Sequence, residues 1–396
     1  MQYRKDKRSG NELSALGFGC MRFPGGMSGL GRIDREKTEK LPLKAYEGGI
    51  NYYDTAYLYS GNEEVLGDIL KKHGLREKIF IATKLPQAMC STASDFDRFF
   101  DIQKQRLHTT YIDYYLLHNI TDFIQWEKLC GLGIKDWISV KKKSGEIRQM
   151  GFSFHGPHGE FVKTLDAYDW DFVQIQYNYI NTHYQAGIEG LHYAEKKGVP
   201  VFVMEPLLGG KLANLPKKAR NILQKAQAGS TQVGWALRFV WNESGVTLLL
   251  SGMNQIAQLE ENLALVEKAL PGNFTDAEQK AIEEVKAEFQ KSYKIPCTGC
   301  NYCMPCPQKI NIPACFESYN NSFALGFGDG IYQYLTSVGG LGNVPHFASD
   351  CVECGKCESH CPQQIKIRHQ LKAVRRRLQL PGFKIMLAFL RKIMSG

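Results

Sequence analysis

Eight short apolar runs between residues 16 and 253 constrain the fold of this chain more than any other feature of its sequence. They read LGFGC, INYYDTA, IFIATK, IDYYLLH, IRQMGFSF, FVQIQYN, PVFVMEP and VTLLLSG. Stretches of helical character separate most of them, for example NEEVLGDILKKHG, in which apolar residues recur at intervals of three and four. Strands that alternate with helices pair in parallel, and eight such units in about 250 residues suit a closed barrel. An open doubly wound sheet is the alternative, but LGFGCMRFPGG lacks the G-x-G-x-x-G turn that usually follows its first strand.

Ionisable side chains stand at the carboxyl ends of three successive runs. Asp54 ends the second run, Lys84 the third and His118 the fourth. Tyr59 follows Asp54 by five residues, at the expected start of the next helix. Each residue alone has an ordinary reading as a helix cap, a surface lysine, a core histidine or a packed tyrosine. Because a barrel gathers its strand ends at one rim, the four residues together predict an active site.

Carbonyl reduction is the chemistry that these four residues suit. A lysine ammonium beside a phenol favours the phenolate, so we expect Lys84 to lower the pKa of Tyr59 from its usual value near ~10. Tyr59 then gives a proton to the carbonyl oxygen as hydride arrives. Asp54 holds Lys84 charged and oriented, and His118 donates a hydrogen bond that positions the carbonyl group.

The segments LGFGCMR, INYYDTAYLYSGNEEVLG, IFIATK, YIDYYLLHN and LEENL resemble the aldo-keto reductase family. The resemblance runs over residues 14–265. It implies an α/β fold, a (β/α)8 TIM barrel, in which Asp54, Tyr59, Lys84 and His118 form the catalytic tetrad. It also implies a small-molecule carbonyl substrate. The loops expected to shape the pocket hold no cluster of positive charge, so we expect that substrate to be neutral.

The same resemblance implies that NAD(P)H lies extended across the rim of the barrel. Ser153 and Gln174 are expected to face the nicotinamide amide. The other expected cofactor contacts come from the end of the first strand, the loop EPLLGGKL, and the last strand and helix. These contacts are Gly19, Met21, Glu205, Pro206, Leu207, Gly209, Ser251, Gly252, Met253, Gln258, Glu261 and Asn262.

Two departures from the family affect the expected cofactor. The fifth strand ends in Ser153, Phe154 and His155, where the family usually has Ser-Asn. In the loop FHGPHG we expect His155 and His158 to be solvated rather than turned into the pocket. Near the last strand, SGMNQIAQ offers no Lys or Arg to the 2′-phosphate of NADPH, which needs a cationic partner. NADPH selectivity is therefore not supported, and NADH or a flavin such as FMN is the alternative.

Eight of the twelve cysteines fall in two dense groups after residue 290. The first group, CTGCNYCMPCP, contains Cys297, Cys300, Cys303 and Cys306. The second, CVECGKCESHCP, contains Cys351, Cys354, Cys357 and Cys361 in the C-x2-C-x2-C-x3-C-P spacing of bacterial ferredoxins. Such groups indicate metal rather than disulfides in a chain that we expect to be cytoplasmic. Two zinc sites are the alternative, although zinc modules usually present two separated C-x2-C pairs.

The ferredoxin resemblance implies two [4Fe-4S] clusters, in which the fourth cysteine of each group binds the other cluster. One cluster then uses Cys297, Cys300, Cys303 and Cys361, and the other uses Cys351, Cys354, Cys357 and Cys306. Cys306 follows Cys303 by three residues rather than four, so Cys315 is a weaker substitute for it. The 44 residues between the groups resemble the helical ferredoxin modules of respiratory reductase subunits. Four cysteines have no such spacing, and we expect them to be small buried residues, namely Cys20, Cys90, Cys130 and Cys315.

These features divide the chain into a barrel domain at 1–285, a small, mainly helical ferredoxin-like iron–sulfur domain at 286–372 and a basic amphipathic tail at 373–396. The tail is expected to pack against the protein, with contact to a membrane surface as the weaker alternative. Much of the net charge of +9 lies there, so we do not expect nucleic-acid binding. The first residues, MQYRKDKRSG, are charged, so we expect no secretory signal, no membrane span and a cytoplasmic location.

Three functions fit this combination. The first is an NAD(P)H-dependent carbonyl reductase whose clusters exchange electrons with a ferredoxin- or flavodoxin-type partner or hold the module together. The second is a ferredoxin-linked oxidoreductase with a flavin in the barrel, because hydride carries two electrons and a cluster passes one. The third is a non-catalytic electron-transfer protein, which the intact set of four residues disfavours. The resemblance across the whole domain favours the first.

Overall fold

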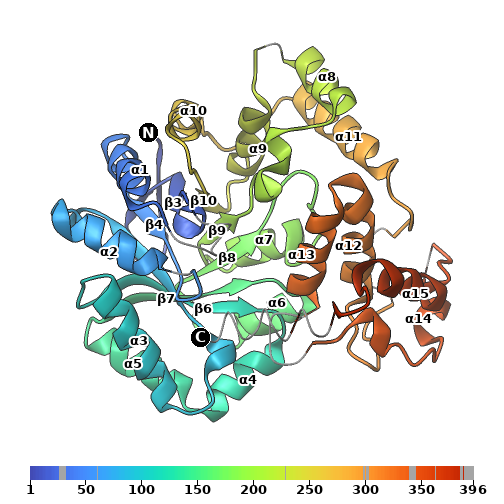
Figure 1. The fold of residues 1–396 in the computed structure, drawn as a ribbon, viewed down its shortest axis with the longest axis horizontal. Coiled ribbons are helices and arrows are strands. Elements are labelled where there is room, and N and C mark those ends of the chain that lie inside the picture. Colours follow the sequence, from blue (N-terminus) through green and yellow to red (C-terminus); the bar gives the residue numbers. More distant parts are fainter. Residues whose placement is uncertain are drawn as a thin grey trace.

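The computed structural model describes residues 1–25, 33–59, 61–227, 229–297, 299, 303–338, 345–361, 363–383 and 387. These residues form a barrel of parallel strands surrounded by helices, with a smaller helical module beside it (Figure 1). Among them, no helix is long and apolar enough to cross a lipid bilayer.

Each of the eight predicted apolar runs overlaps one strand of the barrel. The strands are β3 (Leu16–Gly19), β4 (Tyr52–Asp54), β5 (Phe80–Leu85), β6 (Ile112–Ile120), β7 (Ile147–Phe154), β8 (Phe172–Gln176), β9 (Val201–Met204) and β10 (Val246–Ser251). Each pairs in parallel with the next, and β10 pairs with β3, so the sheet closes. The closed barrel is confirmed and the open doubly wound sheet is wrong. Parallel strands are covered on both faces, which is why they appear as apolar runs in the sequence.

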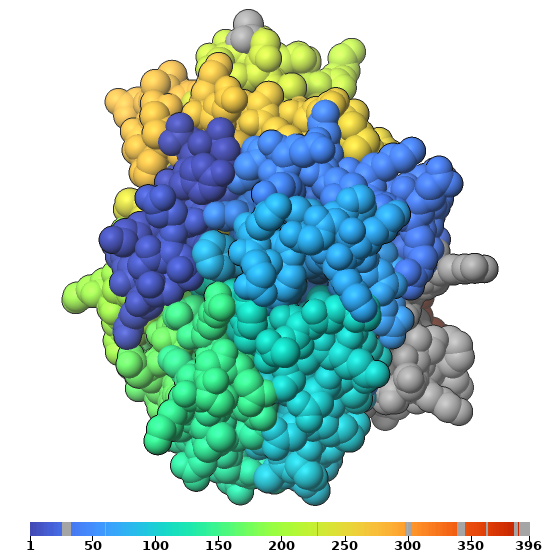
Figure 2. Space-filling model, turned by 90° about the vertical axis from the view of Figure 1, so that its left-hand side faces the viewer, coloured from blue at the N-terminus to red at the C-terminus, as the bar shows by residue number. Residues whose placement is uncertain are grey.

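Helices cover the outer face of the barrel. They are α1 (Arg35–Glu47), α2 (Asn62–Lys72), α3 (Ser94–Arg106), α4 (Phe123–Gly131), α5 (Ile134–Lys143), α6 (His158–Asp166), α7 (Gly187–Lys196), α8 (Lys217–Ala226), α9 (Gln232–Trp241), α10 (Ile256–Val266) and α11 (Asp276–Gln290). Several begin at a side chain that caps a free backbone N–H, as Asp34 does for α1 and Thr231 for α9. Figure 2 shows the helices of the N-terminal half as a continuous outer surface.

The interior of the barrel is filled and closed at its amino end. Its packed side chains are Leu13, Tyr52, Ala82, Tyr114, Leu116, Phe172, Phe202, Leu248 and Leu250. The hairpin of β1 (Tyr3–Lys5) and β2 (Glu12–Ser14) lies below them, and Tyr114 donates a hydrogen bond of 2.9 Å to Oδ2 of Asp6. Because this end is closed, a ligand has access only at the carboxyl ends of the strands, where the predicted site lies.

The second module has its own hydrophobic core, formed by α12 (Ile312–Ala324), α13 (Phe327–Ser337) and α15 (Ile367–Leu378) with the short helix α14 (Lys356–Ser359) at its edge. Helices α12 and α13 lie between the two cysteine groups, as the resemblance to helical ferredoxin modules implies. Helix α15 runs through the expected start of the tail at residue 373 and buries Leu371, Val374 and Leu378 in this core. Half of the expected tail lies outside the described residues.

Candidate functional site

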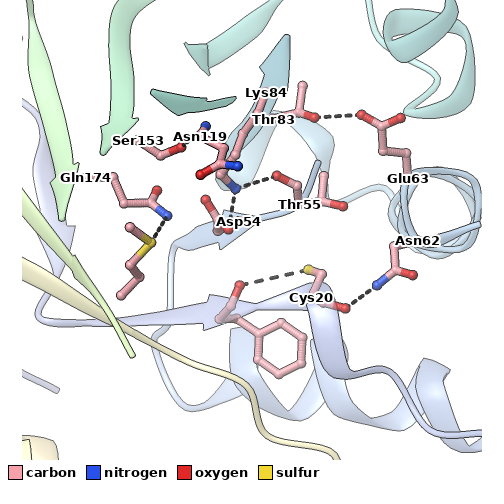
Figure 3. A network of polar contacts seen from close by, with 12 residues as sticks. Cys20, Asp54, Thr55, Asn62, Glu63, Thr83, Lys84, Asn119, Ser153 and Gln174 are labelled. Atoms are coloured by element: carbon pink, nitrogen blue, oxygen red, sulfur yellow. Dashed lines mark hydrogen bonds and ion pairs between the residues drawn. The ribbon is translucent and has the colours of Figure 1, made fainter. Parts of the chain in front are cut away.

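A buried ion pair lies at the carboxyl ends of β4 and β5. Nζ of Lys84 is 2.6 Å from Oδ1 of Asp54 and also donates a hydrogen bond of 2.7 Å to the backbone carbonyl of Thr55 (Figure 3). The side chains of Lys84 and Asp54 are 1% and 5% exposed. Lys84 therefore keeps a fixed position at the mouth of the barrel.

Tyr59 and His118 lie next to this pair, so the four predicted residues come together. Nζ of Lys84 is 5.2 Å from the centre of the Tyr59 ring, and the rings of Tyr59 and His118 meet edge to face at 5.9 Å. Tyr59 lies in the turn before α2 rather than in the helix itself, because α2 begins at Asn62. His118 lies within β6, two residues before its end.

Burial sets the protonation states of these groups. It raises the pKa of Tyr59 well above its ordinary value, and the charge of Asp54 raises it further. The expectation of a lowered pKa for Tyr59 is therefore wrong, because removal from water and the nearby Asp54 both favour the neutral phenol. Burial also lowers the pKa of His118, helped by the charge of Lys84. At neutral pH the phenol thus carries its proton and the imidazole is uncharged.

His155 belongs to this group, although its loop suggested a solvated side chain. Burial lowers its pKa to about 4, a hydrogen bond with Gln185 opposes that shift, and the charge of His155 contributes to the lowered pKa of His118. The expectation for His155 is therefore wrong. His158 is the first residue of α6, and its Nδ1 is buried without a hydrogen-bond partner among the described residues.

Two amide oxygens without hydrogen-bond partners among the described residues lie beside the ion pair. They are Oε1 of Gln174 and Oδ1 of Asn119, and both are buried. The hydroxyl of Ser153 accepts a hydrogen bond of 2.8 Å from the backbone N–H of Asn119, and Nε2 of Gln174 donates one of 3.6 Å to the sulfur of Met204. Buried polar atoms usually have partners, so this set fits a ligand with amide donors, such as a nicotinamide carboxamide.

The loop after β9 approaches Arg22, a residue that the sequence analysis missed. Arg22 donates a hydrogen bond of 2.9 Å to the carbonyl of Gly209, and a side chain at Gly252 would meet its methylenes at 3.2 Å. Gly209 and Gly210 have φ angles of 66° and 96°, a conformation that glycine adopts without strain. Arg22 could have been found from its position directly after Met21, in a segment already expected to contact the cofactor.

Glu205 begins this loop in a strained conformation. Its φ angle is 56°, which is uncommon for a residue with a side chain. Burial raises its pKa to about 7, while the charge of Arg22 opposes the rise. A carboxyl group that changes charge near neutral pH therefore lies at the mouth of the barrel.

The remaining predicted cofactor residues lie on four segments around the same mouth. Gly19 ends β3 close to the carbonyl of Ser251, and Met21 lies in the short helix η1 (Cys20–Arg22). Asn262 of α10 donates a hydrogen bond of 3.0 Å to the hydroxyl of Ser251. Gln258 accepts one of 3.0 Å from the backbone of Asn254. Pro206, Leu207 and Gly252 lie in the loops after β9 and β10, with Met253 buried and Glu261 on α10.

Five of the eight predicted cysteine ligands line one cavity of about 160 Å³ in the helical module, namely Cys303, Cys306, Cys351, Cys354 and Cys357. The cavity thus brings Cys303 and Cys306 of the first group together with the three leading cysteines of the second. Among the described residues, no three cysteine, histidine or carboxylate groups are placed to hold a single metal ion. A cavity of this size lined by sulfur fits a larger group, such as an iron–sulfur cluster.

The other cysteines differ in their surroundings. Cys297 and Cys361 are partly buried, and Cys300 lies outside the described residues. Burial raises the pKa of the Cys315 thiol, and the charge of Cys306 adds to the rise. Cys20 and Cys90 are buried, as expected, and Cys130 is partly exposed.

Comparison with known families gives two matches on this chain. Residues 15–286 match the aldo/keto reductase family, and residues 296–366 match a 4Fe-4S dicluster domain. The first match covers the barrel and its surrounding helices, and the second covers both cysteine groups.

Individual relatives align with the barrel. The oxidoreductase YqkF of Bacillus subtilis is 25% identical over 340 residues, which cover 74% of this chain and all of that protein. L-galactose dehydrogenase of Arabidopsis thaliana is 26% identical over 302 residues, 70% of this chain and 91% of that protein. Among solved structures, the holo form of an aldo-keto reductase from Bacillus halodurans superposes with a TM-score of 0.60 at 26% identity, covering 72% of this chain and 96% of that one. The chain therefore belongs to the aldo/keto reductase family and carries a C-terminal 4Fe-4S dicluster domain.

Proposed function

We propose that this oxidoreductase reduces an aldehyde or ketone, using NAD(P)H in the barrel and Tyr59 as the proton donor. The observation that carries the proposal is the buried pair of Lys84 and Asp54 beside Tyr59, with His118 at the edge of the same ring. A buried charge pair gives little net stability compared with apolar residues, so a barrel without a catalytic role has no reason to keep one at its mouth.

The residues of the chain suit the proton-transfer half of the reaction. The raised pKa of Tyr59 keeps its phenol protonated at neutral pH, so the proton is available when the carbonyl oxygen becomes basic. Lys84, fixed by Asp54 and by the carbonyl of Thr55, places a positive charge where the tyrosine becomes negative. The uncharged imidazole of His118 has an N–H to donate to the carbonyl oxygen of the substrate.

The mouth of the barrel has the groups that a nicotinamide nucleotide needs. When bound, NAD(P)H supplies the hydride. The unpaired amide oxygens of Gln174 and Asn119 are suited to hold the carboxamide together with Ser153. Arg22, beside the glycine loop after β9, is suited to hold the pyrophosphate.

The dicluster domain supplies one-electron chemistry to the same chain. We assign one cluster to Cys297, Cys300, Cys303 and Cys361 and the other to Cys306, Cys351, Cys354 and Cys357. The second set is supported by the cavity that its four members line, which Cys303 of the first set borders as well. Electron exchange with a small redox protein is the function that such a domain serves in this proposal.

A ferredoxin-linked reaction through a barrel-bound flavin is the second candidate. The contact of the helical module with the mouth of the barrel favours it, because Lys211 after β9 pairs at 2.9 Å with Asp329 of α13. A flavin accepts one electron at a time from a cluster, whereas a nicotinamide does so poorly.

One experiment separates the two candidates. The protein is purified without oxygen and denatured, and the absorption spectrum of the released small molecules is recorded. Absence of a flavin spectrum, with NADH or NADPH changing the protein fluorescence on titration and 4-nitrobenzaldehyde being reduced, supports the first candidate. A flavin released in a one-to-one ratio, without nicotinamide binding, supports the second and contradicts the first.

A further inference from the structure

Helix α13 of the iron–sulfur module has two functional faces. Asp329, Tyr332 and Ser337 lie on one side of the helix at the spacing of a single face. Tyr334 and Leu335 lie on the other side, in the core of the module. One side of α13 therefore packs in the module, and the side with Asp329, Tyr332 and Ser337 is left to contact another part of the protein.

That first face lies on the mouth of the barrel. Asp329 pairs at 2.9 Å with Lys211, which follows β9, and Ser337 forms a hydrogen bond with the hydroxyl of Tyr184, which follows β8. Both partners come from loops at the carboxyl ends of strands, the side on which the predicted catalytic residues lie. Figure 1 draws α13 on the side of the module toward the barrel.

Tyr332 lies between these two anchors along α13, and its phenol interacts electrostatically with Glu205 and Arg22 at the mouth of the barrel. Burial raises its pKa, and the charge of Glu205 raises it further. The charge of Tyr332 contributes in turn to the raised pKa of Tyr59. Its side chain is nevertheless 45% exposed. A residue that interacts with groups at the mouth of the barrel and still has accessible surface is available to contact a ligand there.

We propose that Tyr332 is a substrate-binding residue of the barrel site, contributed by the iron–sulfur module. Its ring and hydroxyl contact the part of the carbonyl compound that extends away from Tyr59, so Tyr332 selects among substrates by their distal group. Because Tyr334, on the opposite side of the helix, accepts a hydrogen bond of 2.7 Å from the backbone of Ala348, just before Cys351, the second cysteine group holds this wall in place. The inference rests on the proposed carbonyl reductase activity.

The test compares Tyr332→Ala and Tyr332→Phe with Phe327→Ala. Phe327 lies on the same helix, is 39% exposed and belongs to neither anchor, so its variant controls for damage to α13. The KM for 4-nitrobenzaldehyde and for propionaldehyde is measured with full-length, cluster-containing protein. We expect Tyr332→Ala to raise the KM for the aromatic aldehyde about tenfold or more. The KM for propionaldehyde, the Kd for the nicotinamide nucleotide and the iron content should not change.

Two outcomes overturn the inference. The first is an unchanged KM for both aldehydes in Tyr332→Ala while the wild-type protein turns over. The second is a higher Kd for the nicotinamide nucleotide with no change in the KM for either aldehyde, which would make Tyr332 a cofactor contact. If the wild-type protein reduces neither aldehyde, the proposed function itself fails. Amide hydrogen exchange of residues 327–338 with nucleotide and 4-nitrobenzaldehyde present then decides: slower exchange supports a substrate wall, and unchanged exchange rejects it.

Discussion

The ammonium of Lys84 lies 2.6 Å from Oδ1 of Asp54, and neither side chain has appreciable contact with water. Lys84 has a second partner in the carbonyl of Thr55, whereas Oδ2 of Asp54 has none among the described residues. Burial raises the pKa of Asp54, and the charge of Lys84 opposes that rise. Each charge is therefore retained in the barrel because the other is present.

Replacing Lys84 alone should destabilise the protein as well as inactivate it. Lys84→Met leaves Asp54 as a buried carboxylate without a counter-charge, so we expect a loss of about 3–5 kcal/mol in the free energy of unfolding. The double variant Asp54→Asn/Lys84→Met should regain part of that stability but no turnover, because the pair is coupled. Urea unfolding followed by circular dichroism measures both variants against the wild type. A Lys84→Met protein as stable as the wild type would show that the pair is not buried in solution.

Removing the hydroxyl of Tyr59 should affect turnover and little else. In Tyr59→Phe the ring and its contacts with His118 and Lys84 remain, while the proton donor is lost. We expect turnover to fall by about 10²–10⁴-fold with the nucleotide Kd unchanged. Tyr57→Phe is the matched control, because Tyr57 lies on the same loop but packs against Phe99. Comparable loss in both variants would indicate damage to the loop rather than loss of the acid.

The barrel and its four central residues could be predicted from the sequence for a physical reason. Buried parallel strands need continuous apolar runs, so the runs locate the strands, and the fold brings their ends together. Asp54, Lys84 and His118 at three successive ends were therefore enough to place the site.

The rest of the site depends on contacts between segments far apart in the sequence. Tyr332 lies 273 positions after Tyr59, and no local pattern links the module to the mouth of the barrel. The pKa of Tyr59 was predicted in the wrong direction because its neighbouring cation is visible in the sequence while its burial is not. The sequence around Asn119 does not predict the φ angle of 58° that its backbone adopts.

Glu205 should make the stability of the protein depend on pH. Its pKa is about 7 in the folded chain and near ~4.3 in an unfolded one, so the folded state binds more protons between these values. Stability therefore falls as pH rises through this window, by about 1 kcal/mol between pH 6 and 8. Glu205→Gln removes the titrating group, and its thermal midpoint should change less over the same range.

Circular dichroism melts at pH 6 and pH 8 in the absence of oxygen measure this effect. Glu284→Gln, which alters an exposed carboxylate of α11, serves as the control and should behave as the wild type. A Glu205→Gln protein with the same pH dependence as the wild type would mean that Glu205 is ionised throughout.

The cluster assignment predicts different effects on iron content when Cys306 and Cys315 are replaced. Cys306 lines the cavity with Cys351, Cys354 and Cys357, whereas Cys315 is fully buried and its raised pKa disfavours the thiolate that a ligand needs. We expect Cys306→Ser to lose about four of about eight irons per chain, with the matching acid-labile sulfide, and Cys315→Ala to keep all of them. Iron and sulfide analysis of protein prepared without oxygen checks both variants. Because both changes remove one sulfur from the same small module, the opposite pattern would make Cys315 the fourth ligand and move the second cluster toward α12.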